Sequence, residues 1–458
     1  MRPGGFVARF AGRRASWFAP ALALEVALPT IAMGFYSDDW TQLASFDGRG
    51  PSPHPTFDLY DFASPDTGVA RAIARGPFPW FTDPAIKIHF LRPLTSLVTA
   101  LDHALFGLAP LGYHLDAIAW YVACAALVGW VLRRLLPSSP AVANVAACLW
   151  AIDEAHQQPV GWLASRHVEV GGLFALAALG LHVAWRRDGL SAGRWLAPIA
   201  FALALAGSES GLAALAFVLA FEIFERAGTL RRRAQAALEA TLPWLALLGV
   251  YAVIYTGLGC GAAHNGAYFD PAVHPLRFLA AVALRYPLLV GDALLNVPSD
   301  LSNILPRAPF YVAAAIGVAL YAGLFRAIRG ELTIEERRAL ALLGLGAAAS
   351  LFVSLGAFPG GRVLFLPSLF TSTLFALVLL RARGAASGSR ALRRVGFVVT
   401  LVFHVVLAPL VFVVDSLGTG AMARRAEGAT DALVAEGIVG RRVVLVAGSD
   451  PFTSLYPM

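Results

Sequence analysis

Two adjacent carboxylates, Asp38 and Asp39, directly follow a long apolar run near the N-terminus. A carboxylate at a membrane surface can take the proton of an attacking hydroxyl, and a second carboxylate can position the acceptor or raise the pKa of the first. The same pair would also suit the solvated end of a helix. We take Asp38 and Asp39 as the candidate catalytic residues, with the structural alternative left open.

Three basic side chains, Lys87, His89 and Arg92, precede a moderately apolar segment. Basic residues at a membrane interface often only extend toward lipid headgroups. Here they stand before Leu94–Leu108, which Asp102 interrupts. This pattern predicts an interfacial or re-entrant helix rather than a span. Charge-assisted hydrogen bonds from the three side chains would suit a lipid phosphate.

Further ionisable side chains interrupt the apolar pattern downstream. Such residues are costly within a membrane, so each is by default a candidate for function. The structural alternative for each is a hydrogen bond within the helix bundle. They are His114, His156, Arg166, Glu209 and Arg362.

The sequence predicts neither a cofactor nor a metal site. The histidines show no ligand spacing of a known type. The sequence leaves open whether a divalent cation binds weakly near Asp38-Asp39. Cys124 and Cys148 fall in apolar runs, and Cys260 lies in a predicted loop without an evident partner, so no disulfide framework is expected. There is no P-loop and no glycine-rich nucleotide fingerprint, which argues against transport driven by ATP within this chain.

The composition indicates how these residues are positioned. Hydrophobic residues make up 58% of the 458 positions and charged residues 14%, whereas soluble domains carry about 25% charged residues. A bilayer explains the missing charge. The length accommodates about eleven spans of roughly 20 residues, which predicts an all-α polytopic membrane protein. The net charge of +7 comes from arginine clusters between apolar runs, so no nucleic-acid partner is implied.

The arginine clusters also predict the topology, because basic loops stay in the cytoplasm. The N-terminus is expected inside, followed by a long outer loop, residues 37–110, that carries the acid pair and interfacial helices. The segment Gly257–Arg307 is expected outside as well. We expect one membrane domain, residues 1–414, and a short outer tail, residues 415–458, containing a strand-like run at Val443–Ala447.

Five motifs in collinear order resemble those of the GT-C glycosyltransferases, most closely the protein O-mannosyltransferase-like group with its transmembrane-and-tetratricopeptide members. The resemblance spans about Tyr36–Leu380 and includes no tetratricopeptide part. The motifs are Asp38-Asp39; Arg92-Pro93-Leu94 with Leu105-Phe106-Gly107-Leu108 and Gly112-Tyr113-His114-Leu115; His156 through Val160-Gly161-Trp162 to Arg166; Glu209-Ser210-Gly211; and Arg362-Val363-Leu364-Phe365-Leu366-Pro367-Ser368.

This resemblance implies a bundle of about eleven spans with a catalytic cavity on the outer face. It also implies transfer of a sugar, with inversion, from a polyprenyl-phosphate donor to a hydroxyl of a protein, glycan or lipid acceptor. Asp38, which matches the first acid of the group, would be the base. The donor and acceptor contacts would come from Lys87, His89, Arg92, His114, His156, Arg166, Glu209 and Arg362. The arginine, alanine and glycine bias suggests a bacterial cytoplasmic membrane, with the site facing outward.

Two positions depart from the motifs of the group. Gln158 stands where relatives commonly have an acid, and Ser208 where they commonly have a lysine. The alternative function is a non-catalytic or transporter-like component of cell-envelope polysaccharide or lipid-carrier export. A carrier would show paired halves with broken helices, and no such symmetry is evident. Convergence of the acid pair, Arg92, Arg166 and Glu209 on one outward cavity would favour transfer.

Overall fold

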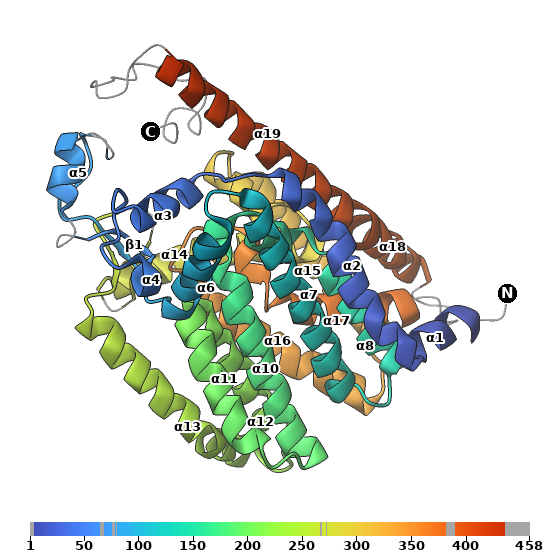
Figure 1. Ribbon diagram of the computed structural model, residues 1–458. Helices are drawn as coiled ribbons and strands as arrows, with labels where there is room; N and C mark the ends of the chain where they lie inside the picture. The colour runs from blue at the N-terminus through green and yellow to red at the C-terminus, as the bar shows by residue number, and fades with distance from the viewer. Residues whose placement is uncertain are drawn as a thin grey trace.

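The computed structural model describes residues 4–64, 68–75, 78, 80–265, 268–271, 273–381 and 390–435. It is a multi-span membrane protein built from long helices that run roughly side by side (Figure 1). Among the described residues, seven segments are long and apolar enough to cross a membrane. They are Arg14–Ala32, which includes α2 (Phe18–Ala27); α7, Pro110–Leu135; Leu163–Asp188, which is mostly α10 (His167–Asp188); α13, Leu230–Gly257; α14, Pro275–Leu295; α15, Ala308–Ile328; and Arg390–Gly428, from α18 (Arg390–Thr400) into α19 (Ala408–Ala435).

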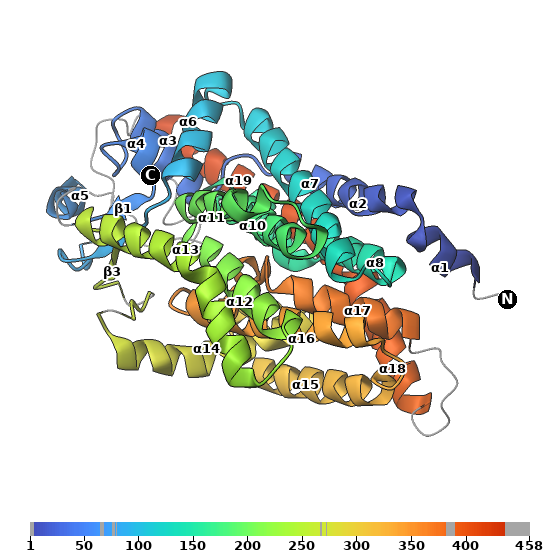
Figure 2. The ribbon, with the colours of Figure 1, turned by 90° about the horizontal axis from the view of Figure 1, so that it is seen from below.

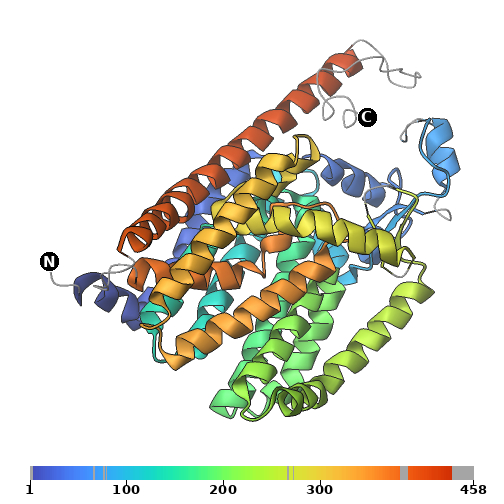
Figure 3. The same ribbon diagram turned by 180° about the vertical axis from the view of Figure 1, so that it is seen from behind.

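Shorter apolar helices complete the bundle. Three of them are α8 (Pro140–Ala151), α11 (Gly193–Gly207) and α17 (Ser368–Arg381). In addition, α12 (Ala213–Glu225) packs against the longer helix α16 (Ile334–Ser354). Seen from below, α7, α10 and α11 lie in one layer and α14, α15 and α16 in another (Figure 2). Figure 3 shows α19 running along one edge of the molecule. The remaining helices are α1 (Gly4–Ala11), α3 (Asp38–Phe46), α4 (Pro55–Asp58), α5 (Val69–Arg75), α6 (Pro93–Phe106) and α9 (Gln157–Gly161).

The sequence sets several helix starts locally. Proline occupies the first turn of α6, α7 and α8 at Pro93, Pro110 and Pro140, where its missing N–H costs nothing and its fixed φ suits the helix. Helix α16 begins with a capping box in which Thr333 and Glu336 bond each other's backbone N–H groups. The helix predicted at Leu94–Leu108 is present as α6, Pro93–Phe106.

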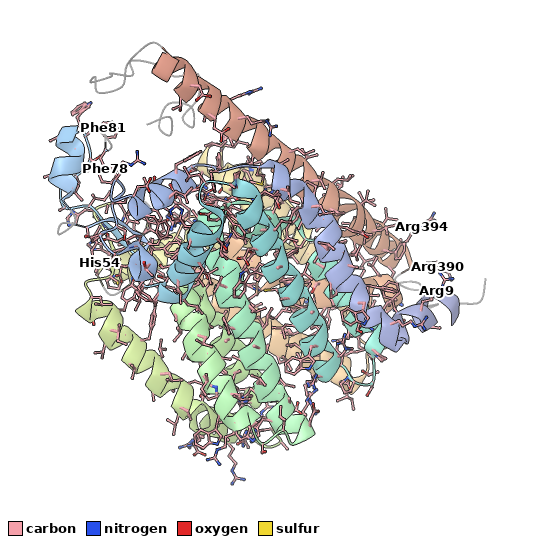
Figure 4. The ribbon with its side chains drawn as sticks, viewed as in Figure 1. Arg9, His54, Phe78, Phe81, Arg390 and Arg394 are labelled. Carbon is pink, nitrogen blue, oxygen red and sulfur yellow. The ribbon has the colours of Figure 1, made fainter. Side chains whose placement is uncertain are left out.

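At one end of the bundle, arginines form ion pairs with acids from other segments. Arg187 at the end of α10 bonds Glu225 of α12 at 2.8 Å, and Arg381 at the end of α17 bonds Glu336 of α16 at 2.7 Å. Arg393 of α18 pairs with Glu331. In Figure 4 the labelled Arg9, Arg390 and Arg394 lie at one side of the molecule, and His54, Phe78 and Phe81 of the first loop lie at the other. The clusters predicted to share one membrane face therefore meet at one end.

The opposite end carries the first loop and a small antiparallel sheet. Strands β1 (Asp61–Ala63), β2 (Lys87–His89) and β3 (Gly261–Ala263) pair in the order β1-β2-β3. The sheet joins the loop before α6 to the loop after α13. Apart from this sheet, the described secondary structure is helical, as the predicted fold class requires.

The segment Gly257–Arg307 contains a long apolar helix that the sequence analysis did not predict. The segment was expected outside, whereas α14 is long and apolar enough to be a span although Arg285 and Asp292 interrupt it. Arg285 donates to the backbone carbonyls of Leu355 and Ala357, and Asp292 accepts from Ser299, so both charges have partners that sequence reasoning did not foresee. The predicted strand at Val443–Ala447 lies outside the described residues.

Candidate functional site

The turn before α3 brings the acid pair against the 3₁₀ helix Leu163–Ser165. Asp39 is 2% exposed, and its carboxylate accepts from the backbone N–H of Tyr36 at 2.9 Å and of Ala164 at 2.7 Å. Burial raises the pKa of Asp39 to about 7, against the effect of these two bonds. Asp38, the first residue of α3, is only partly buried. The two acids therefore differ: Asp39 anchors the turn, and Asp38 is the more accessible of the pair.

Other contacts hold this turn in an unusual conformation. Ser37 adopts a φ of 54°, which costs a residue with a side chain about 1–3 kcal/mol. His114, fully buried on α7, bonds the carbonyl of Gly34 at 3.0 Å. Of the predicted site residues, His114 thus positions the turn that leads into Asp38, and its ring is buried away from solvent.

Arg92 and Glu209 form an ion pair that joins α6 to the loop between α11 and α12. Nε of Arg92 donates to Glu209 at 2.8 Å, and the guanidinium lies 4.6 Å from the ring centroids of both Tyr60 and Phe90. Within the described part of the chain, the two terminal nitrogens of Arg92 donate to no acceptor. Such a stacked, pre-oriented guanidinium retains donors for an anionic ligand.

Arg362 approaches from the other half of the chain. It lines a small cavity together with Ser210, Ser350 and Ser354, and no acid among the described residues forms an ion pair with it. Its guanidinium lies 5.9 Å from the ring centroid of Trp162, and that ring lies 6.3 Å from Tyr36 in the acid-pair turn. Trp162 therefore connects Arg362 to the segment that carries Asp38.

His167, which sequence analysis missed, belongs to the same region as the two arginines. It interacts electrostatically with both Arg92 and Arg362, bonds Ser208 at 3.0 Å, and contacts Tyr60 edge-on at 5.6 Å. Its position directly after Arg166, at the start of a span, was the signal that could have identified it. Ser208, which replaces the lysine of the related motif, thus orients this histidine.

Arg166 has different partners from those expected. It is fully buried, pairs with Asp102 of α6, lies 3.4 Å from Asp116 of α7, and donates to the carbonyl of Tyr113 at 2.7 Å. Two carboxylates therefore already balance its charge. Arg166 therefore joins α6 to α7, whereas the resemblance implied that it contacts the sugar donor or the acceptor.

His156 also lies away from the cavity. It is fully buried, its ring nitrogens bond Tyr121 and Ser368 at 3.1 Å each, and burial lowers its pKa to about 3, which keeps it neutral. It joins α7 to the start of α17. Gln158, the other departure from the related motif, belongs to the neighbouring helix α9.

Lys87, His89 and Arg92 do not converge on one point. His89 bonds Asp58 at 2.8 Å and lies 3.7 Å from the sulfur of Cys260. Burial by itself would lower the pKa of His89, but the bonds to Asp58 and Cys260 outweigh it and raise the pKa to about 10. Lys87, two residues earlier on β2, forms no ion pair with a described residue. Of the three, Arg92 alone contacts Glu209.

Comparison with known proteins gives one related sequence. The chain matches no profile of a known protein family. It is 32% identical over 147 residues to the Protein O-mannosyl-transferase Tmtc1 of Drosophila melanogaster. The match covers 32% of this chain and 15% of the fly protein, so the chain corresponds to a small part of that relative.

Solved structures with a similar fold include two membrane proteins. One is ArnT from Cupriavidus metallidurans bound to undecaprenyl phosphate, with a TM-score of 0.46, 17% identity, and coverage of 99% of this chain and 84% of that one. The other is the Archaeoglobus fulgidus oligosaccharyltransferase tethered to an acceptor peptide, with a TM-score of 0.42, 13% identity, and coverage of 95% and 60%. The sequence match to the fly protein confirms, over part of the chain, the resemblance to protein O-mannosyltransferases that the motifs predicted.

Proposed function

We propose that this protein is a GT-C-type membrane glycosyltransferase that moves a sugar from a polyprenyl-phosphate donor to an acceptor hydroxyl, with inversion, on the outer face of a bacterial cytoplasmic membrane. The related O-mannosyl-transferase sequence and the collinear motifs support the reaction class. Helix α3, which begins with the acid pair, lies at the opposite end of the bundle from the C-terminal ends of α10 and α17, which carry the ion-paired arginines (Figure 1). This arrangement supports the outward orientation.

The observation that carries the proposal is that Arg362 and Ser210 line one small cavity, while Glu209, the residue next to Ser210, accepts from Arg92 at 2.8 Å. The two arginines come from distant parts of the chain, and both interact electrostatically with His167. Arg92 has one acidic partner and unused donors, while Arg362 has no ion pair with a described residue. Guanidiniums that retain N–H groups without an acceptor suit a phosphate, whose oxygens accept bidentate hydrogen bonds.

The acid-pair turn supplies the base on the other side of Trp162. The acceptor oxygen attacks the anomeric carbon and gives its proton to Asp38, while the bond from that carbon to the donor phosphate breaks. The leaving polyprenyl phosphate keeps the bonding electrons, and Arg92 and Arg362 stabilise the charge that develops on it. Proton transfer to a positioned carboxylate contributes typically about 10²–10⁴ in rate.

The other predicted site residues have supporting parts in this scheme. Glu209 fixes the orientation of Arg92, His114 holds the turn before Asp38, and Arg166 and His156 hold the helices that carry the site. The unused ammonium of Lys87 lies on the strand that leads to Arg92, where it can attract the anionic donor to the outer surface.

Transfer from a panel of polyprenyl-phosphate sugars to soluble and lipid acceptors tests this function with purified protein in vesicles. We expect transfer with one donor and loss of that transfer in Arg362→Gln. Arg424→Gln, on the outer part of α19, is the matched control and should keep full activity. If the donor crosses the bilayer but no sugar is transferred, the carrier function takes the place of this proposal.

A further inference from the structure

The small sheet brings together side chains that can bind a metal ion. Asp61 of β1 lies opposite His89 of β2 in the antiparallel register, so their side chains share one face. Asp58 ends the adjoining helix α4. The ligand atoms of Asp58, Asp61 and His89 all lie within 4.8 Å of one another. Figure 1 shows β1 beside α4, at the end of the bundle that carries α3 and α6.

A fourth candidate metal ligand, Cys260, lies beside these three side chains. Gly261 of β3 lies opposite His89, and the preceding residue, Cys260, is buried with its sulfur 3.7 Å from Nε2 of His89. Ligand atoms around a tetrahedral zinc ion are about 3.3–3.6 Å apart, given bond lengths of about 2.0–2.3 Å. Shifts of about 1 Å would therefore bring the ligand atoms of Asp58, Asp61 and His89 onto one ion. The spacing of these residues in the sequence did not predict a metal site, because they come from two loops that are far apart along the chain.

We propose that Asp58, Asp61 and His89 of the first loop and the Cys260 thiolate of the loop after α13 together bind a zinc-class divalent ion. The mixture of imidazole, carboxylate and thiol favours zinc over magnesium or calcium, which prefer oxygen donors alone. Asp61 is 3% and His89 7% exposed, so the ion would be shielded from bulk water. The site is separate from the weak cation site considered for Asp38-Asp39.

The ion would act as a structural cross-link. Three strands of three residues each are too short to be stable by themselves. Their pairing nevertheless fixes the first outer loop against the loop after α13, and Arg92 follows β2 by three residues. A metal ion that binds both loops would stabilise this junction and so hold Arg92 in place. This inference does not depend on which reaction the protein catalyses.

Metal analysis of the full-length protein tests the site. After dialysis against zinc and then against metal-free buffer, we expect about one bound zinc per chain in the wild type and a loss of at least about tenfold in affinity in His89→Gln and in Asp61→Asn. Asp83→Asn is the control, because Asp83 and His264 form a similar but exposed pair in the same region, 3.3 Å apart. Its zinc content should be unchanged.

A second measurement remains informative if the variants fold poorly. Cys260 is the one cysteine outside the apolar helices of the bundle, since Cys124 lies in α7 and Cys148 in α8. In the folded wild type, zinc should protect Cys260 from a thiol reagent at least about tenfold, and a chelator should remove that protection. Wild-type protein that retains no zinc, or zinc that leaves Cys260 equally reactive and the midpoint of thermal unfolding unchanged, would overturn the proposal.

Discussion

Neighbouring carboxylates have different chemistry when one of them is buried. Both oxygens of Asp39 accept backbone N–H groups, so this side chain has little capacity left for an acceptor proton. Asp38 begins α3 beside it and is more accessible. Burial and hydrogen bonding thus separate a positioning role for Asp39 from a basic role for Asp38.

Replacing each acid by its amide tests this division. Asp38→Asn removes the basic group, so transfer should fall about 10²–10⁴-fold with folding and donor binding unchanged. Asp39→Asn should reduce transfer less and lower the thermal stability, because an amide cannot accept both backbone N–H groups. Transfer rates and unfolding midpoints in detergent distinguish the two. Full activity in both variants would remove the acid pair from the mechanism.

The pKa of Asp39 predicts how stability depends on pH. An aspartate in the unfolded chain titrates near about 3.9, whereas burial raises the pKa of Asp39 in the folded protein to about 7. Between these values the folded state binds the additional proton, so stability falls as the pH rises and becomes constant above about pH 7. Asp39→Asn lacks this contribution. The stability advantage of the wild type over the variant should therefore shrink between about pH 4 and about pH 7; a constant difference would contradict the assignment.

The arginines should also respond differently to a conservative change. Lysine cannot reproduce a planar, bidentate guanidinium, so Arg92→Lys and Arg362→Lys should weaken donor binding about tenfold or more. Arg166→Lys should chiefly lower stability, because Arg166 bridges Asp102 and Asp116 inside the bundle. Donor affinity and thermal midpoints measured on all three variants check this. If the Arg166→Lys protein were stable but bound the sugar donor more weakly, Arg166 would belong to the phosphate site.

At the scale of elements, glycines allow α10 and α11 to meet closely next to the site. A methyl group on Gly207 would lie 2.9 Å from the backbone nitrogen of Gly171, and one on Gly171 would lie 2.7 Å from Cβ of Ser208. Neither helix can relieve such contacts by a side-chain rotation, because the obstacle is backbone or lies close to it. The spacing of the two helices therefore fixes where Ser208 and Glu209 stand.

Substitution of Gly207 measures this effect. Gly207→Ala should destabilise the protein by about 1–3 kcal/mol and raise the KM for the donor, since Glu209 would move relative to Arg92. Gly249→Ala is the control, because nothing lies within 4 Å of the added methyl group, and alanine in a helix is favoured over glycine by about 0.5–1 kcal/mol. Thermal midpoints and KM values report both changes, and equal behaviour of the two variants would exclude the close packing as a determinant of the site.

At the scale of the whole molecule, the polar and arginine-rich ends predict the orientation in the membrane. His54 and Arg394 lie at opposite sides of the molecule and are exposed (Figure 4). In a variant without the native cysteines, His54→Cys should react with an impermeant thiol reagent from outside, and Arg394→Cys only after the membrane is opened. Labelling of Arg394→Cys in intact cells would invert the topology and move the proposed site to the cytoplasmic face.

The sequence by itself determined the class of the molecule and the residues worth inspecting. Charge is so costly in a bilayer that composition alone implies membrane spans, and the breaks in the apolar pattern located Arg92, Glu209 and Arg362. Helix starts such as Pro93 and Pro110 are also local, because they depend on the conformation of one or two residues.

The tertiary structure decided which of these side chains meet. Whether Arg166 binds a phosphate or two carboxylates depends on the placement of Asp102 and Asp116, and the contact of His89 with Asp58, Asp61 and Cys260 depends on strand pairing between separate loops. The role of His167 likewise follows from two arginines that are far from each other along the chain. Local sequence carries little information on such contacts, because their energy is gained only when distant segments pack together.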